Sequence, residues 1–358
     1  MKFGLHQGIQ FLLFLLLGQS LILPAIASER SVKQANTLNQ QGLQLLESGN
    51  PGKALQVLQQ AQAIYEGSNY TTGIYGTLIN QSLAYKQMGQ YYSACNNLTQ
   101  VLSLNKEICR RLSQTNQEEL KVALEKSLDI DQSQKAIAFH NLGNILRLLG
   151  QLEASEIVLK QGLHYADLLN NEDRYTITLE LANTYQSLYK QAYNQFSISS
   201  NSVSQANTLN KAQQYAEAAI ANYQSVAESS SEDRIHAQLN TLQLLLHLGQ
   251  SNSPVLIDTY NQPQNLISPY IKDLISADFS QFSTNEAINL KLKLSYLLPD
   301  FDSLAIPNSN NNLSLAYSLA KTALRQAESF GDRRLLSRAY GVFGKLYLQS
   351  DQLDLTFA

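Results

Sequence analysis

Large apolar and small residues recur at a fixed spacing along most of the chain. Between residues 38 and 61, Gly42 is followed seven positions later by Gly49, Ala54 lies five positions further on, and Leu58 follows four positions after that. Apolar residues three and four positions apart lie on one face of a helix. The stretch therefore predicts two helices joined by a turn at Gly49, with Gly42 and Ala54 small enough to let the helices approach closely.

The same frame recurs, which is the sequence signature of a repeat protein. Three strong copies have turn glycines at Gly49, Gly89 and Gly150, and a further first helix lies at Tyr340–Tyr347. Two weaker copies include Leu181–Tyr185, where Tyr189 stands at the expected turn glycine, and a helix that ends at Gly249. The step from Gly49 to Gly89 is longer than the ~34 residues of a standard repeat of this type, which predicts helices about a turn longer.

This frame resembles the tetratricopeptide repeat. The family's first helix carries a bulky-x-x-Leu-Gly-x-x-Tyr pattern and its second an Ala-x-x-x-Phe-x-x-Ala pattern. The clearest match here is the run of Phe139, Leu142, Gly143, Leu146 and Gly150. The resemblance implies an all-α fold, a right-handed superhelical solenoid of antiparallel helix pairs, and we expect it over residues 28–250.

Several segments interrupt the period. We expect a helical insertion near residues 102–130 and a Ser/Asn-rich loop at Ser197–Asn207, with the second helix of that repeat displaced to about Lys211–Ala227. Residues 251–312 should be irregular, because prolines break long helices and Leu298–Asn312 has the composition of a loop. Helical patterns resume at Asn285–Leu297 and Leu313–Ser329. Residues 313–358 have the pattern of terminal repeat helices that are cut short. We therefore expect the chain to be one piece of a longer or split protein, or a truncated product. The prolines of the irregular region are Pro254, Pro263, Pro269, Pro299 and Pro307.

Residues 1–27 read as a secretory signal. Lys2 precedes an apolar core at Phe11–Leu17, and Ala25-Ile26-Ala27 supplies the small residues that a signal peptidase accepts. The stretch is shorter than the ~20 residues that span a bilayer comfortably. We expect cleavage near Ala27 and export to the periplasm or outside the cell, with an uncleaved membrane anchor as the alternative.

Composition and charge exclude several classes of protein. Charged residues are 15% of the chain and the net charge is −3, so there is no basic excess of the kind that indicates nucleic-acid binding. With 44% apolar residues, the chain is not expected to be disordered. No nucleotide-binding, metal-ligating or serine-hydrolase spacing occurs. We expect no cofactor, no metal and no enzymatic activity.

The two cysteines leave three interpretations open. Cys95 follows the small position Ala94, so it could simply pack in the core, or it could pair with Cys109 in an exported protein. A nucleophilic pair of Cys109 with His140 is the third interpretation.

The tetratricopeptide resemblance implies that the first helix of each pair lines a concave groove that binds a protein or peptide. Carrying the family's groove positions onto matching residues gives a candidate set, in which Asn144 and Arg147 could hold a peptide backbone or carboxylate by hydrogen bonds. The alternative is an ordinary solvated helix face. The candidates are Asn39, Lys86, Gln87, His140, Asn144, Arg147, Asn183, Gln186, Arg338 and Lys345.

A second resemblance is to the N-terminal repeats of exported cyanobacterial proteins that carry a CHAT domain, a caspase-like module. The resemblance rests on the segments Leu83–Tyr91 and Ala327–Arg334, but no segment of this chain matches the catalytic module. We therefore expect an exported, non-enzymatic scaffold, and the resemblance implies the partner or remnant of such a protease. The alternatives are an inert fragment, or a hydrolase using acidic residues of the irregular region, among them Asp258, Asp273, Asp278 and Asp300 with Tyr260.

Overall fold

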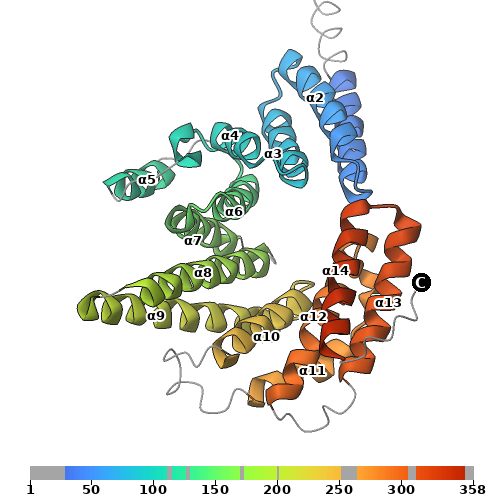
Figure 1. Cartoon of the computed structure of the whole chain (residues 1–358). Helices are drawn as coiled ribbons and strands as arrows, with labels where there is room; N and C mark the ends of the chain where they lie inside the picture. Colours follow the sequence, from blue (N-terminus) through green and yellow to red (C-terminus); the bar gives the residue numbers. More distant parts are fainter. Residues whose placement is uncertain are drawn as a thin grey trace, which may run out of the picture. The chain divides into compact units, whose positions relative to one another are not determined.

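A computed structural model describes most of the chain in two compact units, Met1–Asn141 and Leu142–Ala358 (Figure 1). Each unit is treated separately below. The signal sequence expected at residues 1–27 lies outside the described residues. The described ranges are 29–110, 115–125, 130–169, 173–199, 201–250, 264–304 and 312–350.

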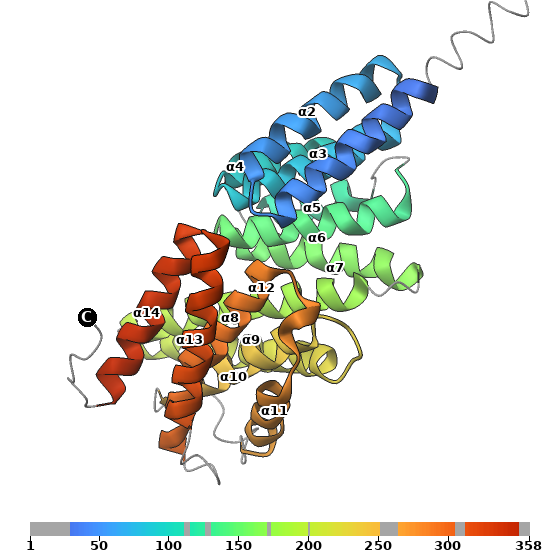
Figure 2. The ribbon, with the colours of Figure 1, turned by 90° about the vertical axis from the view of Figure 1, so that its right-hand side faces the viewer.

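Unit 1 is made of helices that pack against their neighbours in the chain. Residues 29–47 form the first helix, which runs beside α2 in both Figure 1 and Figure 2. The others are α2 (Pro51–Gly67), α3 (Thr71–Gln87), α4 (Tyr91–Val101), the 3-10 helix η1 (Lys106–Cys109), α5 (Thr115–Glu125) and the first part of α6 (Gln132–Leu148). The helices η1 and α5 lie where the sequence led us to expect a helical insertion, near residues 102–130.

Unit 2 continues the helix-after-helix arrangement, and no strand occurs in the described part of either unit. Its helices are the end of α6, α7 (Leu152–Leu168), α8 (Asp173–Ile198), α9 (Ser202–Ala227), α10 (Arg234–Gln250), α11 (Gln264–Ser276), η2 (Phe279–Gln281), α12 (Thr284–Leu297), η3 (Leu298–Leu304), α13 (Asn312–Phe330) and α14 (Arg333–Gln349). Consecutive helices such as α8 and α9, or α13 and α14, lie side by side (Figures 1 and 2). The all-α, tetratricopeptide-like architecture of antiparallel helix pairs is confirmed.

Glycines in the left-handed conformation end the first helix of successive pairs. Gly49, Gly89 and Gly150 have φ of 75°, 74° and 76°, a region that glycine enters without steric cost. In the first of these turns the Gly49 amide donates to Leu46 O at 3.0 Å, and the Asn50 amide donates to Leu45 O at 2.8 Å. This pair of bonds satisfies the last carbonyls of the helix and reverses the chain.

Close packing inside each pair depends on small residues in the frame. A Cβ added to Gly42 would lie 2.6 Å from Leu58 Cγ, and one added to Gly143 would lie 2.4 Å from Leu159 Cγ. Ala54 is fully buried on the partner helix. The predicted close approach of paired helices is therefore present in both units.

The loop predicted at Ser197–Asn207 is too long, because α8 extends to Ile198 and α9 begins at Ser202. Residues 202–207 belong to α9, which is as long as α8, at 26 residues each. Asn201 starts α9 because its Oδ1 accepts hydrogen bonds from the amides of Val203 at 2.9 Å and Ser204 at 3.2 Å. Ser and Asn are common in loops, but at this position Asn201 caps a helix.

The region predicted to be irregular contains more helix than expected. It includes α11, which has Pro269 in its interior, and the described part of Leu298–Asn312 begins with η3. The predicted helices at Asn285–Leu297 and Leu313–Ser329 correspond to α12 and α13. Residues 251–263 and 305–311 lie outside the described part.

Cys95 and Cys109 form a disulfide that joins α4 to η1. Their Cα atoms are 5.9 Å apart and both side chains are buried. The pairing answers the question left open by the sequence. A nucleophilic Cys109–His140 pair is therefore wrong, because the sulfur of Cys109 is bonded to that of Cys95.

Candidate functional site

Polar side chains from alternate helices of unit 2 form a hydrogen-bonded run across the repeats. Asn240 of α10 donates from Nδ2 to Asn183 Oδ1 of α8 at 2.8 Å. Lys293 Nζ of α12 in turn donates to Asn240 Oδ1. Three successive first helices therefore share one polar face, which we call the polar face of unit 2.

The polar face continues onto α14. Arg338 donates from Nη1 to Asn289 Oδ1 of α12. Lys345 Nζ donates at 2.6 Å to both Tyr296 O and Asp300 Oδ2, so its charge is paired. The face thus consists of side chains from α8, α10, α12 and α14, namely Asn183, Gln186, Lys190, Asn240, Asn289, Lys293, Arg338 and Lys345.

At the α6 end of unit 2, Arg147 forms a cross-repeat ion pair. Its Nη2 atom lies 3.2 Å from Glu180 Oε2 of α8, and both side chains are largely buried. Below this pair, the Tyr223 hydroxyl of α9 donates to Asn183 Oδ1 at 2.7 Å and to Gln186 Oε1 at 3.2 Å. Burial, and then the nearby charge of Glu180, raise the pKa of Tyr223, so its hydroxyl stays protonated.

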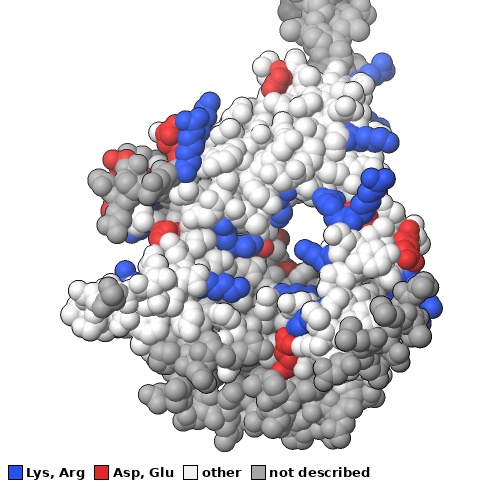
Figure 3. Space-filling view, in the orientation of Figure 1, with Lys and Arg blue, Asp and Glu red and all other residues white. Residues whose placement is uncertain are grey.

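Three cations of the polar face have no carboxylate partner within the described residues. Lys293 and Arg338 donate only to neutral amides, and Lys190 of α8 has no hydrogen bond or ion pair there. We call Lys190, Lys293 and Arg338 the cation cluster. Figure 3 shows Lys and Arg side chains over α12 and α14 of unit 2.

Burial and mutual repulsion act on the cation cluster. The pKa of Lys293 falls to about 8, first because the side chain is buried and then because Lys190 and Arg338 repel its charge. Partial burial lowers the pKa of Lys190 as well. Burial and the charge of Lys190 lower the pKa of His247 on α10, so the imidazole is neutral near neutral pH.

Some buried polar atoms beside the polar face lack a hydrogen-bond partner in the described structure. They are Asn144 Oδ1 and Arg147 Nε at the end of α6, and Gln186 Nε2 on α8. Such atoms are uncommon in folded proteins because each one costs free energy. Of the predicted residues, Asn183 and Gln186 share the hydroxyl of Tyr223, on which the charge of Arg147 also acts, and Asn144 lies one turn before Arg147 on α6.

The predicted groove residues of unit 1 form a separate group. Asn39 Oδ1 accepts from Asn80 Nδ2 of α3 at 3.0 Å, and Gln87 Nε2 donates to Leu46 O at 3.4 Å. Lys86 and His140 are partly buried, on α3 and α6. These contacts link neighbouring first helices, as the repeat frame implies.

The candidate set from the sequence omits Lys190, Asn240 and Lys293. Lys190 lies seven positions after Asn183, so both sit on one face of α8. That spacing was a usable signal, but the repeat frame is degenerate there because Tyr189 replaces the turn glycine. Asn240 and Lys293 lie in degenerate copies of the repeat. In these copies the sequence alone did not assign either residue to a groove position.

The acidic residues proposed for a hydrolase are occupied in structural roles. Asp273 Oδ2 lies 3.1 Å from Arg234 and accepts from Gln238 at 2.8 Å. Asp278 caps η2 through the amide of Ser280, and Asp300 pairs with Lys345. The other candidates, Asp258 and Tyr260, lie outside the described residues. Among the residues described, no group of His, Cys, Asp and Glu side chains could hold a metal ion.

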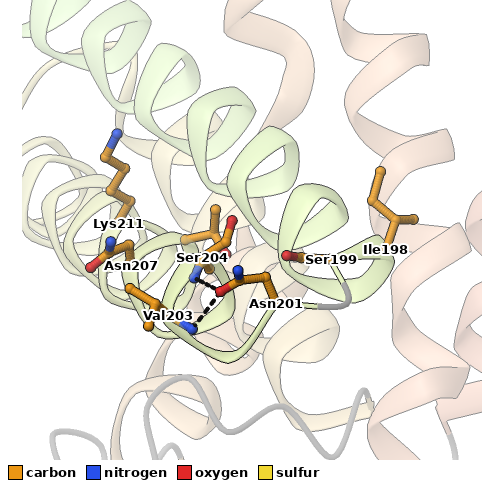
Figure 4. A pocket seen from close by; sticks show the side chains of 8 residues that line it. Ile198, Ser199, Asn201, Val203, Ser204, Asn207 and Lys211 are labelled. Carbon is orange, nitrogen blue, oxygen red and sulfur yellow. Dashed lines mark hydrogen bonds between the residues drawn. The ribbon is translucent and has the colours of Figure 1, made fainter.

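An open hollow lies where α8 meets α9 (Figure 4). Ile198, Val203 and Lys211 line it together with Asn201, whose side chain is already used to cap α9. Ile198 and Val203 are 83% and 68% exposed. Among the residues that line the hollow, Lys211 is the titratable one, and the others are polar or apolar.

Within the described part of the chain, no helix has the length and apolar composition needed to cross a bilayer. This finding covers only the helices given above.

Comparisons with known proteins add a weak likeness to other helical-repeat structures. No protein-family model matches the sequence, and no curated protein matches it either. The chain is similar to the nearly identical TPR-like repeats of a Podosopora anserina protein described as a kinesin light chain, with 14% identity over 69% of this chain and 99% of that chain, at a TM-score of 0.43. It is also similar to BtubC from P. vanneervenii, with 10% identity over 85% and 92% of the two chains and a TM-score of 0.41.

Proposed function

We propose that this chain is a non-enzymatic scaffold that binds a protein or peptide on the polar face of unit 2. The observation that carries the proposal is the run of side chains across α8, α10, α12 and α14, with cations that no carboxylate of the described residues neutralises. A solvated helix face has no need to link four alternate helices or to leave Gln186 Nε2 buried without a partner in the described structure.

The test compares protein captured by the intact chain with protein captured by two variants of equal charge. Lys190→Gln with Arg338→Gln changes the polar face, whereas Lys321→Gln with Arg325→Gln removes two exposed cations from α13. A partner that is retained by the α13 variant and lost by the polar-face variant supports the proposal. Equal recovery by all three proteins contradicts it. Asn144→Ala is a poorer probe, because Asn144 is buried and its replacement could unfold α6.

We further propose that the chain is exported. The signal-like residues 1–27 support this, and so does the Cys95–Cys109 disulfide, since disulfides persist in oxidising compartments and are rare in the cytosol. Mass analysis of the native protein tests it: a mature chain that starts near Ser28 is expected, and an intact Met1 with reduced cysteines would contradict export. An association with a caspase-like CHAT module is part of the same proposal and rests on the sequence resemblance alone.

A further inference from the structure

We infer that the cation cluster of unit 2 binds a carboxylate supplied by an acidic peptide segment. The inference deepens the proposed function, on which it rests, because it assigns a chemical class to the partner and a place where that partner is recognised.

The first argument is charge balance on the polar face. Arg147 pairs with Glu180, and Lys345 pairs with Asp300. Lys190, Lys293 and Arg338 are left over, with no carboxylate partner in the described structure.

The second argument is the cost of leaving these cations together. Lys293 is partly buried and is repelled by the exposed Lys190 of α8 and Arg338 of α14, the two charged groups that act on it, while α10 gives it only the neutral amide of Asn240. Like charges close to a partly buried lysine disfavour its charged state. An anion bound among the three cations would offset their mutual repulsion. The arrangement of the cations therefore favours binding of a negatively charged ligand.

The third argument concerns the shape and chemistry of that ligand. Lysine and arginine both bind carboxylates through charge-assisted hydrogen bonds. The amide oxygens that now accept from Lys293 and Arg338 belong to Asn240 and Asn289, and they hold the two cations in place without neutralising them. Near Lys190, the exposed face also presents the imidazole of His247, whose ring packs at 5.7 Å against the buried ring of Tyr189. A peptide that carries Asp or Glu beside ordinary side chains fits this mixture better than a bare polyanion.

The experiment measures binding of short fluorescent peptides to the full chain. One peptide carries Glu residues and an amidated C-terminus, a matched peptide replaces every Glu with Gln, and a third has neutral side chains and a free terminal carboxylate. We expect the Glu peptide to bind at least about tenfold more tightly than its Gln counterpart, as hydrogen bonds to charged groups allow. Binding of the third peptide alone would mean that the source is a terminal carboxylate, which still supports a carboxylate site.

Variants separate this site from general electrostatic attraction. Lys190→Gln with Arg338→Gln should abolish the preference for Glu, whereas Lys321→Gln with Arg325→Gln should preserve it, and Lys190→Arg should retain it. An equal loss in both double variants would overturn the inference. So would competition by polyuridylic acid at equal affinity, because it would show that any polyanion suffices.

Proton uptake gives a second readout. A bound carboxylate should raise the pKa of Lys293, so binding near pH 8 takes up protons, and the heat of binding should depend on the ionisation enthalpy of the buffer. No buffer dependence would overturn the assignment of Lys293 to the site. If the acidic peptides fail while a captured partner still depends on Lys190 and Arg338, the carboxylate inference fails and the proposed function stands.

Discussion

The Ser155 hydroxyl of α7 donates a hydrogen bond to the carbonyl oxygen of Gly143 on α6 at 2.7 Å. The bond forms where the two helices come closest, because Gly143 has no side chain and Leu159 of α7 fills that space. A single small residue therefore sets both the packing and a buried hydrogen bond of this helix pair.

We predict that Gly143→Ala destabilises the chain and that Gly344→Ala does not. The new Cβ at position 143 would meet Leu159 Cγ at 2.4 Å, and overpacking of this kind costs about 1–3 kcal/mol. Position 344 has the same place in the repeat frame, yet a Cβ there meets nothing within 4 Å. Alanine should then raise helix stability by about 0.5–1 kcal/mol. Urea unfolding followed by circular dichroism measures both, and equal losses would contradict the packing account.

Tyr223→Phe should lower the free energy of unfolding by about 1–2 kcal/mol. The buried hydroxyl donates to Asn183 and Gln186, and the variant leaves Gln186 Oε1 without that donor. Tyr340→Phe is the matched control, because Tyr340 is 58% exposed and surface changes of this kind usually stay within about 0.5 kcal/mol. Similar values for the two variants would show that the Tyr223 bonds contribute nothing.

Lys293→Met should stabilise the free chain at neutral pH. The Lys293 pKa is about 8 in the folded protein and about 10.4 in an unfolded chain. Lysine therefore destabilises the fold fully below pH 8, and this cost falls as the pH rises from 8 towards 10.4. The gain should be on the order of 2–3 kcal/mol at pH 7, reduced by the donor that Asn240 loses.

The pH dependence is the informative part of that experiment. Unfolding of both proteins is measured at pH 7 and pH 10, and the difference between them should shrink at the higher pH. A difference that stays constant would mean that Lys293 is not held in an unfavourable charged state. The same measurement on Lys321→Met is the control, since that exposed side chain lies on α13.

Reduction of the disulfide should destabilise unit 1. Cys95 and Cys109 are 14 positions apart, and a loop of that size corresponds to about 3 kcal/mol in the chain-entropy description. Thermal unfolding with and without dithiothreitol measures the loss. A Cys95→Ala, Cys109→Ala variant should unfold at the lower temperature in both conditions, and sensitivity of that variant to the reductant would point to another cause.

The sequence predicted the fold well where helix patterning and turn chemistry agree. Gly49, Gly89 and Gly150 each mark a turn that the structure places at the end of a first helix. At Ser197–Asn207 the composition pointed to a loop, but Asn201 acts as a helix cap and the helices on both sides are long. Local composition does not distinguish these two uses of Ser and Asn, because both depend on side-chain bonds to nearby amides.

The candidate site was predicted only in part. Asn183, Gln186 and Arg338 do lie on the polar face, as the repeat frame suggested. Lys293 was missed because its significance comes from repulsion by Lys190 and Arg338, which are far from it in the chain. Such long-range charge relationships appear only once the helices are packed. The disulfide, too, needed the distance between two Cα atoms rather than the spacing in the sequence.

The Cys95–Cys109 crosslink also sets how unit 1 responds to mechanical force. A chain pulled from its two ends cannot extend the segment between the two sulfurs, even after every helix has come apart. Fourteen residue steps at up to ~3.6 Å each amount to about 50 Å of hidden length. Reduction would release that length, so the extension of a single stretched molecule would report directly on the redox state of its surroundings.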